Sequence, residues 1–337
     1  MVKKTIVEIM VPESISVRKQ FFPYNEPMPE LPEVQTTVDG INRRTKGQTI
    51  IDVWTDLAIS SPIKQFIGTL KEEKFYKSFK KTVVGAKILK AERRAKNILI
   101  HLNNAHTILV HMKMTGHMMY GKYDFDKKQN KWFPHVTEKN EALKDPYNRF
   151  IHVVFSLDNN KHLVLSDVRK FAKVTLIKTS ELFESIHLKH HGPEPLDKTF
   201  SLEEFKKRLF KRPNTYIKQA LLDPKVVAGV GNIYGDELLW EAGVHPLRLV
   251  KNIKPKEFDL MYIAMKNVLQ RGIDFGGDSM SDYRDIDGKR GKFQNDHNAY
   301  RLTGTKCKKK GCNGKIERIM VGARSAHFCN THQKLVV

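Results

Sequence analysis

Three kinds of feature are scarce in this 337-residue chain. It has three cysteines, all at or beyond residue 307, which excludes a disulfide framework and favours a metal site in a reducing compartment. No apolar run approaches the length of a membrane span, so we expect no membrane partner. Acidic residues are also few: 37 Asp and Glu stand against 59 Lys and Arg, which leaves a formal net charge of +22.

The excess of positive charge favours a polyanionic partner, because Lys and Arg that neutralise phosphates drive nucleic-acid binding. The alternative is a solvated basic surface on a protein with an unrelated role. Hydrophobic residues make up 40% of the chain, which is enough for sizeable cores, and the length favours two domains.

The first half of the chain is rich in short β-branched runs, which predict packed strands. These runs are 82–89, 97–102, 107–112, 151–155, 162–165 and 173–177. Residues 121–149 are polar and interrupted by Pro, so we expect a loop there.

Helices are predicted in the second half. Ser201 and Glu204 have the spacing of a capping box, and Pro255 opens an amphipathic helix. Residues 272–300 are rich in Gly, Asp and Ser, and a loop of this length is typical of a functional lid or a disordered segment.

The segment MPELPEV at residues 28–34 could supply a nucleophile if the working chain begins at Met28. Removal of Met28 would leave Pro29 with a free secondary amine. An α-amino group has a pKa near ~8, against ~10.4 for a Lys side chain, so much of it is neutral at neutral pH. Such an amine can attack a sugar C1′ and form a Schiff base while Glu30 moves protons. The alternative is a Pro-rich turn before an ordinary amphipathic helix.

Residues 1–27 lack the apolar core and the cleavage site of a signal peptide, and they mix acidic with basic side chains, unlike a transit peptide. They are either upstream sequence, joined to the chain by a wrongly assigned translation start, or a genuine N-terminal extension. We adopt the hypothesis that Met28 is the working start.

Two further motifs have an ordinary and a functional interpretation. In the run Arg93-Arg94-Ala95-Lys96, like charge should lower the pKa of Lys96, although a basic edge that binds phosphate explains the run equally well. The run 225–234 contains Gly229 and Gly231 before a predicted helix. It suits a phosphate cradle, or a simple connection between two helices.

The cysteines form the pattern Cys307-x4-Cys312-x16-Cys329-x2-His332. Three thiolates and an imidazole at these spacings fit a tetrahedral structural zinc site. The alternative is three free cysteines.

Taken in chain order, these motifs resemble the formamidopyrimidine-DNA glycosylase (Fpg/MutM) branch of the Fpg/Nei family over residues 28–334. The segments that carry the resemblance are 28–34, 93–96, 111–116, 167–171, 225–246 and the cysteine cluster with the run 322–329. The loop 276–294 looks like the one that caps 8-oxoguanine, which favours the oxidised-purine branch over the Nei branch. In the usual family pattern the ligands are C-x2-C-x16-C-x2-C, so the wider first gap and His332 are departures.

The resemblance implies a role for each matching residue. Catalysis would use Pro29 as nucleophile, Glu30 and Lys96 for proton transfer, and Arg324 for phosphate binding and δ-elimination. Met114 would fill the gap left by a flipped base, Arg169 would face the orphaned base, and Phe171 would intercalate. Phosphate and DNA contacts would come from Arg212, Lys218 and Asn232. One structural Zn²⁺ per chain would be held by Cys307, Cys312, Cys329 and His332.

The resemblance also implies an α+β multidomain fold. It consists of an N-terminal β-sandwich with flanking helices and a C-terminal helix-two-turn-helix domain with a zinc-finger β-hairpin. The expected limits are an extension at 1–27 that need not be translated or retained, a catalytic domain at 28–185, a DNA-binding domain at 196–300 and a zinc finger at 301–337. The lesion-capping loop would be 273–300.

The implied function is that of a bifunctional DNA glycosylase and AP lyase of base excision repair. It would remove 8-oxoguanine and formamidopyrimidines from duplex DNA through a Schiff base on the N-terminal proline, followed by β,δ-elimination. We expect a monomer that acts on DNA with oxidised bases or abasic sites in the bacterial cytoplasm, associated with the nucleoid. The alternatives are a Nei-like glycosylase for oxidised pyrimidines, or a non-catalytic damaged-DNA-binding protein if residues 1–27 are retained.

Overall fold

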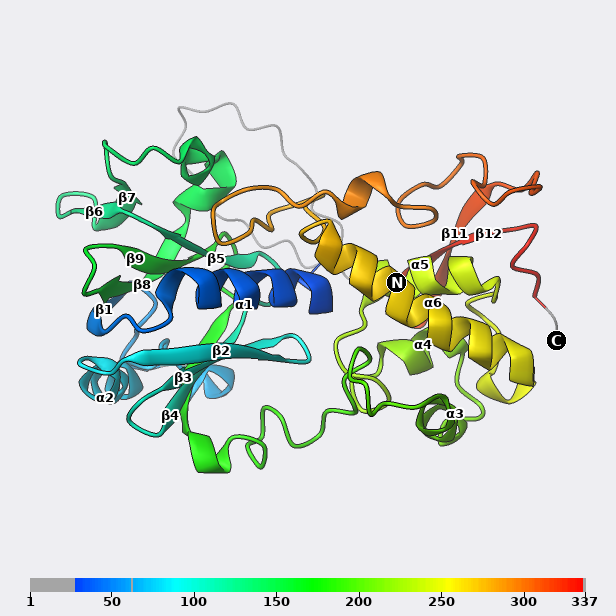
Figure 1. Cartoon of the computed structure of the whole chain (residues 1–337), viewed down its shortest axis with the longest axis horizontal. Coiled ribbons are helices and arrows are strands. Elements are labelled where there is room, and N and C mark those ends of the chain that lie inside the picture. The colour runs from blue at the N-terminus through cyan, green and yellow to red at the C-terminus, as the bar shows by residue number, and fades with distance from the viewer. Residues whose placement is uncertain (1–27, 62, 336–337) are drawn as a thin grey trace, which may run out of the picture.

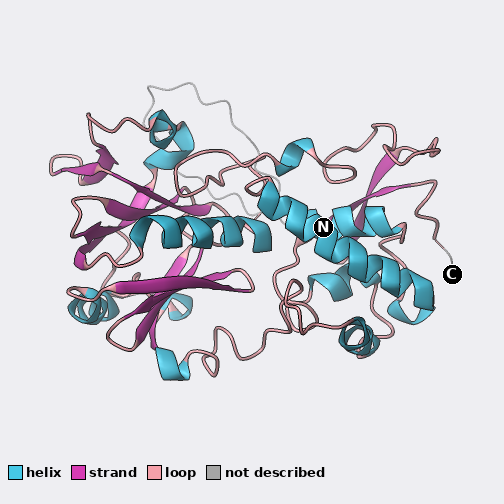
Figure 2. Cartoon of the chain, viewed as in Figure 1, coloured by secondary structure: helices cyan, strands magenta, loops and turns pink. Residues whose placement is uncertain are grey.

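Most strands lie in one half of the molecule and most helices in the other, as Figure 2 shows. The computed structural model describes residues 28–61 and 63–335 (Figure 1). The predicted fold class, an α+β protein with an N-terminal sandwich and a C-terminal helical part that carries a hairpin, is confirmed.

The N-terminal half is built on two four-stranded antiparallel sheets. One has the order β1 (Ile50–Thr55), β8 (Ile151–Leu157), β9 (His162–Asp167), β5 (Gly116–Gly121). The other has the order β10 (Lys173–Lys178), β4 (His106–His111), β3 (Asn97–Leu102), β2 (Ile88–Arg94). Their inner faces share one hydrophobic core with the apolar side of helix α1, which runs along the opening between the sheets in Figure 1.

Helix α1 (Leu31–Thr45) follows from the local sequence. Pro32 stands in its first turn, where a missing N–H costs nothing, and Val34, Val38 and Ile41 are buried at helical spacing. After the helix ends, Gly47 takes a positive φ of 85°. The local sequence therefore accounts for both the helix and its end.

The C-terminal half is a helical bundle with an attached hairpin. Its helices are α3 (Leu202–Phe210), α4 (Ile217–Leu222), α5 (Asn232–Ala242) and α6 (Pro255–Asp274). The Ser201 hydroxyl accepts a hydrogen bond from the Glu204 N–H at 3.2 Å and so caps α3, and Pro255 opens α6 as predicted. Strands β11 (Ile316–Val321) and β12 (Arg324–Cys329) pair as an antiparallel hairpin that packs on α5.

Short 3-10 helices connect the larger elements. They are η1 (Lys64–Phe66), η2 (Glu141–Lys144), η3 (Pro146–Arg149), η4 (Thr179–Glu181), η5 (Val250–Asn252) and η6 (Phe293–Asn295). Between α6 and β11 the structure has η6 and otherwise irregular backbone, which agrees with the predicted long loop.

Two local predictions were wrong. The strand expected at 82–89 is instead the end of helix α2 (Glu73–Val83) and the start of β2. The region 121–149 is not only a loop, because it contains the hairpin of β6 (Tyr123–Asp126) and β7 (Lys131–Pro134), followed by η2 and η3. The other predicted strands correspond to β3, β4, β8, β9 and β10.

Within the described residues, no helix is both long enough and apolar enough to span a membrane.

Candidate active site

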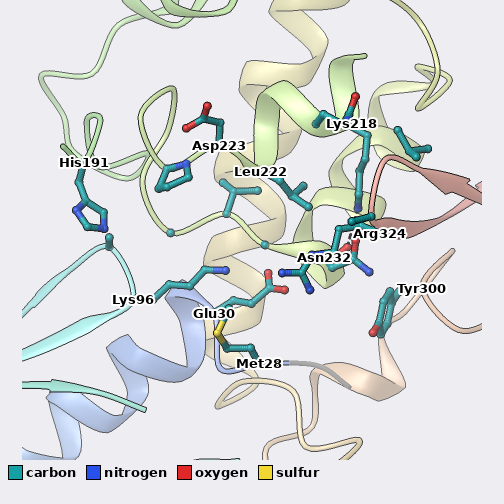
Figure 3. Close-up of a pocket in the computed structure, with 18 of the residues that line it drawn as sticks. Met28, Glu30, Lys96, His191, Lys218, Leu222, Asp223, Asn232, Tyr300 and Arg324 are labelled. Carbon is teal, nitrogen blue, oxygen red and sulfur yellow. Dashed lines mark hydrogen bonds between the residues drawn. The ribbon is translucent and has the colours of Figure 1, made fainter. Parts of the chain in front are cut away.

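A cavity of about 480 Å³ lies where the two halves meet (Figure 3). Its lining comes from the start of α1, the β2–β3 turn, helix α4, the start of α5 and the C-terminal hairpin. Five of the predicted site residues line it: Glu30, Lys96, Lys218, Asn232 and Arg324. Met28 also lines the cavity, and Pro29 is buried between Met28 and Glu30.

Glu30 is held at the start of two helices at once. It is the residue before α1, and its carboxylate accepts hydrogen bonds from the backbone N–H groups of Ile233 at 3.0 Å and Tyr234 at 3.4 Å, in the first turn of α5. Burial raises the pKa of Glu30, while Lys96 and these N–H groups oppose the rise. A carboxyl group so placed can hold a proton at higher pH than an exposed one.

Lys96 and Glu30 approach each other beside Gly231. Figure 3 shows its amine directed toward the Glu30 carboxylate. A Cβ built on Gly231 would overlap Glu30 and lie 2.5 Å from Lys96 Nζ, so the absence of a side chain at Gly231 lets both groups approach the backbone of α5. Burial lowers the pKa of Lys96, which favours a neutral amine.

The run before Lys96 is held by one acidic residue. Glu194 pairs with the guanidinium groups of both Arg93 and Arg94, and it accepts the Ala95 N–H at 2.6 Å. The two arginines are therefore engaged with protein, which disfavours the phosphate-edge interpretation. The expected lowering of the Lys96 pKa has the right direction, but burial comes first among its causes, and the cations that contribute are Arg324 and Lys218.

Glu33 connects α1, α5 and the loop after α6. Its carboxylate accepts hydrogen bonds from the Tyr234 hydroxyl at 2.6 Å, the Asp278 N–H at 2.7 Å and the Glu30 N–H at 2.7 Å. Burial, and then the neighbouring Glu30, raise the pKa of Glu33 to about 7. Glu33 thus fixes the backbone of Glu30 from behind.

Lys218 is buried beneath the cavity wall. Its amine donates to the Asn232 carbonyl at 2.9 Å and to Asp236 Oδ1 at 2.6 Å. The other oxygen of Asp236 accepts the backbone and ring N–H groups of His327 on β12, at 3.0 and 2.9 Å. This chain of contacts fixes the hairpin on α5, and Arg324 projects from the same hairpin into the cavity lining.

Three of the remaining predicted residues lie together on two neighbouring turns. The Arg169 guanidinium donates to Met114 Sδ at 3.3 Å and lies 4.6 Å from the centre of the Phe171 ring. Asp167 fixes the second turn by accepting from the Thr115 hydroxyl and from backbone N–H groups. Phe171 is 43% exposed, so the group presents an apolar tip and a guanidinium outward. Arg212 does not join it, because its guanidinium pairs with Asp223.

The four predicted metal ligands form one cluster. The ligand atoms of Cys307, Cys312, Cys329 and His332 lie within 4.8 Å of one another. His332 Nδ1 is 3.5 Å from Cys307 Sγ and 3.7 Å from Cys312 Sγ, while its Nε2 lies 3.0 Å from the Trp240 carbonyl of α5. The ring nitrogen that faces the thiols is therefore the one available to a metal.

Two family models match the chain. They are the formamidopyrimidine-DNA glycosylase N-terminal domain, over residues 28–174, and the formamidopyrimidine-DNA glycosylase H2TH domain, over residues 191–284. The formamidopyrimidine-DNA glycosylase of Desulforamulus reducens is 34% identical over 310 residues, which cover 91% of this chain and 99% of the relative. This chain belongs to the formamidopyrimidine-DNA glycosylase family. It is accordingly a DNA glycosylase of base excision repair with AP lyase activity.

Other relatives agree with this assignment. The formamidopyrimidine-DNA glycosylase of Herpetosiphon aurantiacus is 36% identical over 302 residues, covering 90% of this chain and 98% of the relative. The complex of Lactococcus lactis Fpg with DNA containing an abasic site superimposes with a TM-score of 0.75 at 28% identity, covering 91% of this chain and 100% of that one. The complex of the same protein with DNA containing N7-benzyl-Fapy-dG gives a TM-score of 0.74 at 29% identity, with the same coverage.

Sequence reasoning missed two residues of this glycosylase site. The motifs give Glu194 no role, although it holds the two arginines before Lys96. Asp236 was noted only as part of the motif, although it links Lys218 to the hairpin. The one available signal was the acidic Asp236 within the largely apolar run of α5, since a buried charge requires partners.

Proposed function

We propose that this glycosylase removes oxidised purines from duplex DNA with the Pro29 amine as nucleophile, and then cleaves the abasic site by β,δ-elimination. The observation that carries the proposal is the meeting of Glu30 and Lys96 at Gly231, in a cavity that begins beside Pro29. The Lactococcus lactis relative is solved both with Fapy-dG DNA and with DNA containing an oxidised pyrimidine, so the oxidised-purine choice is supported by the predicted capping loop.

The nucleophile sets a condition on the chain. In the 337-residue chain the Pro29 nitrogen is an amide, and an amide nitrogen cannot form a Schiff base. The proposal therefore requires a form that begins at Pro29. Residues 1–27 lie outside the described residues, and the match to the family's N-terminal domain starts at residue 28.

The proposed chemistry follows from the raised pKa of Glu30 and the lowered pKa of Lys96. As the Pro29 nitrogen bonds to C1′, the bond from C1′ to the base breaks and the base leaves with a proton. Glu30 holds a proton that it can give to the sugar oxygen when the ring opens to the iminium. A neutral Lys96 amine can accept the proton that the nucleophile loses and pass it to the departing base, which leaves uncharged. The iminium acidifies the 2′ proton, and loss of that proton expels the 3′ phosphate. Loss of the 4′ proton from the resulting conjugated iminium then expels the 5′ phosphate.

The proposed DNA contacts use the charge and shape around the cavity. Arg324 would bind the phosphates at the lesion and assist δ-elimination. Asn232 and Lys218 would contact the DNA backbone where it passes the start of α5. The gap that the flipped base leaves in the duplex would be filled by Met114, Arg169 and Phe171. Arg212 would need to leave Asp223 before binding phosphate. In this proposal the protein acts as a monomer on duplex DNA of the bacterial nucleoid. Its domain limits are 28–185, 196–300 and 301–337.

We propose one structural zinc per chain at the Cys307, Cys312, Cys329 and His332 cluster. Three thiolates and one imidazole are a donor set that zinc accepts in tetrahedral geometry. Bound there, the ion would supply no chemistry to the reaction and would fix the hairpin that carries Arg324. The hydrogen bond from His332 Nε2 to the Trp240 carbonyl would orient the imidazole.

The test is borohydride trapping on a duplex with 8-oxoguanine opposite cytosine, with chains expressed from Met1 and from Met28. We expect a crosslink from the Met28 form, with Pro29 as the modified residue in peptide mass analysis. Glu30→Gln should lose base excision while duplex affinity largely survives, because Glu30 handles protons rather than phosphates.

The other outcomes contradict the proposal in different ways. An equal crosslink from an intact Met1 chain would assign the reaction to another amine, Lys96 first. A crosslink from neither form would favour a protein that only binds damaged DNA. Faster turnover of thymine glycol than of 8-oxoguanine would favour the Nei-like alternative.

A further inference from the structure

The middle of the lesion-capping loop, residues 283–288, is built into the N-terminal half. We call these residues the anchor segment. Ile286 is 1% exposed and belongs to the core formed by α1 and the two sheets. A Cβ on Gly40 of α1 would overlap the Ile286 side chain, so the absence of a side chain at Gly40 lets Ile286 pack against the helix. The Tyr120 N–H donates to the Ile286 carbonyl at 2.8 Å, at the outer edge of β5. Figure 1 shows this loop crossing from the end of α6 to the sheets.

Arg284 gives the anchor segment a buried ionic contact. Its guanidinium pairs with both oxygens of Asp145 at 3.1 to 3.2 Å and lies 4.8 Å from the centre of the Tyr147 ring. The side chain is 2% exposed, whereas that of Asp145 is 26% exposed. A buried guanidinium requires such a partner, so the pair selects one position of the loop.

The end of the anchor segment makes further contacts with three elements. The Asp287 carboxylate pairs with Arg44 at 2.8 Å, and the Asp287 carbonyl accepts from the Asn140 side chain at 2.7 Å. The Asn148 side chain donates to the Gly288 carbonyl at 3.2 Å. Asn140, Asp145 and Asn148 all belong to the stretch of η2 and η3, which the sequence indicated only as a loop.

The residues just before the anchor segment are fixed at both ends. The Asp278 N–H is held by Glu33, and the Tyr283 hydroxyl donates to the Glu33 carbonyl at 3.0 Å. Between them, Met280 is 38% exposed, and residues 281 and 282 are partly exposed. Residues 280–282 therefore form a short tip whose two ends are already ordered, which lowers the entropy lost when the tip closes on a ligand.

We propose that the anchor segment, through Arg284 and Ile286, positions the loop tip over the flipped base. This inference rests on the proposed function. Arg284, Ile286 and Asp145 are then positioning residues, since they act through the tip and not on the sugar. Their contribution should be needed while a damaged base occupies the cavity and should be dispensable once the site is abasic.

The test compares Arg284→Met with Lys144→Gln in the Met28 form. Lys144→Gln removes the same charge from the same neighbourhood, but its partner is Glu141 in an exposed pair that contributes little to stability. Single-turnover rates are measured on an 8-oxoguanine duplex and on an abasic duplex, with hydrogen exchange of residues 276–292. For Arg284→Met we expect base excision to fall about tenfold or more, abasic cleavage to stay within about twofold, and exchange to rise. Lys144→Gln should leave all three unchanged.

Two results would overturn the inference. One is faster exchange of the loop in Arg284→Met with normal excision of 8-oxoguanine. The other is an equal loss of both activities, which would indicate a general defect. Ile286→Ala provides a second variant, because it weakens the anchor without leaving an unpaired charge, and it should reproduce the selective loss. If the unsubstituted protein neither excises nor cleaves, the proposed function itself fails, which is distinct from either result.

Discussion

Among the residues of the candidate active site, Gly231 is the glycine with the least room for a side chain. It lies directly before α5, and both the Glu30 carboxyl and the Lys96 amine approach the position that its Cβ would take. Its φ of −130° is open to any residue, so its requirement is space and not backbone conformation. A methyl group there would compete with the two groups proposed to move protons.

Gly231→Ala should therefore separate chemistry from binding. We expect the rate of base excision and the yield of borohydride crosslink to fall about 100-fold, because displacement of catalytic groups by about 1 Å has costs of this size. Affinity for abasic duplex should change little, since the proposed phosphate contact of Arg324 comes from the hairpin. Thermal unfolding serves as the control for folding. Excision within about twofold of the unsubstituted protein would show that Glu30 and Lys96 need not stay where they are.

Sequence could identify the residues of the cavity but not their partners. Glu30, Lys96, Lys218, Asn232 and Arg324 were selected from motifs, and the structure brings all five to one cavity. The role of Glu194 could not be predicted, because it pairs with arginines about 100 positions earlier and spacing carries no signal over that distance.

Among the elements, α2 shows how a β-branched run can mislead. Its end contains Thr82 and Val83, which favour a strand by propensity. Phe75, Phe79 and Val83 nevertheless recur at a spacing of four, and the last two are fully buried against the sheets. Burial of this apolar stripe outweighs local propensity. The β6–β7 hairpin was missed for a related reason, since its Trp132 packs on the distant Trp54.

The loop that follows α6 contains at its base a buried ion pair with a predictable response to pH. His297 Nε2 lies 2.8 Å from Asp278 Oδ2, and both side chains are nearly inaccessible. Burial lowers the pKa of His297, but Asp278, with Glu237 behind it, outweighs burial and raises that pKa above its usual value. A histidine of this kind contributes stability that is fully present below its unfolded pKa, near ~6.5, and is lost as pH rises through the folded pKa.

We therefore expect the stability difference between the unsubstituted protein and His297→Gln to depend on pH. Urea unfolding at pH 6 and pH 9 measures it, and groups that titrate alike in both proteins cancel in the difference. The substitution should cost more free energy of unfolding at pH 6 than at pH 9, because His297 loses its charge, and with it the ion pair to Asp278, as the pH rises through its raised folded pKa. A cost that is the same at both pH values would mean that His297 stays neutral in the folded protein.

In the molecule as a whole, each half has a large hydrophobic core of its own. One core joins α1 to the two sheets, and the other joins α3 to α6 with the segments between them. Leu31, the first residue of α1, belongs to the second core, so α1 connects the halves. Local patterns predicted the two halves but not their relative placement, because the contacts across the junction come from single residues such as Leu31, Ile286 and Glu33.

Removal of the metal should disable one part of the molecule and spare the other. The cluster of Trp240, Ala299, Cys307, Ile316 and Cys329 joins the hairpin to α5, and within the described residues it shares no member with the core of the sheets. Without the metal, the thiols would lose their common ligand and the hairpin its support, while the sheets would keep theirs.

We expect a strong chelator to lower affinity for an abasic duplex at least about tenfold, because Arg324 and the hairpin would no longer be held at the cavity. The near-ultraviolet signal of Trp54 and Trp132 in the N-terminal half should persist, and added zinc should restore binding. His332→Cys offers a sharper comparison, since a fourth thiolate can still hold zinc but cannot donate to the Trp240 carbonyl as His332 does. Metal retention with weakened DNA affinity would locate the effect in that hydrogen bond. Unchanged affinity after complete metal removal would show that the Asp236 contacts alone hold the hairpin in place.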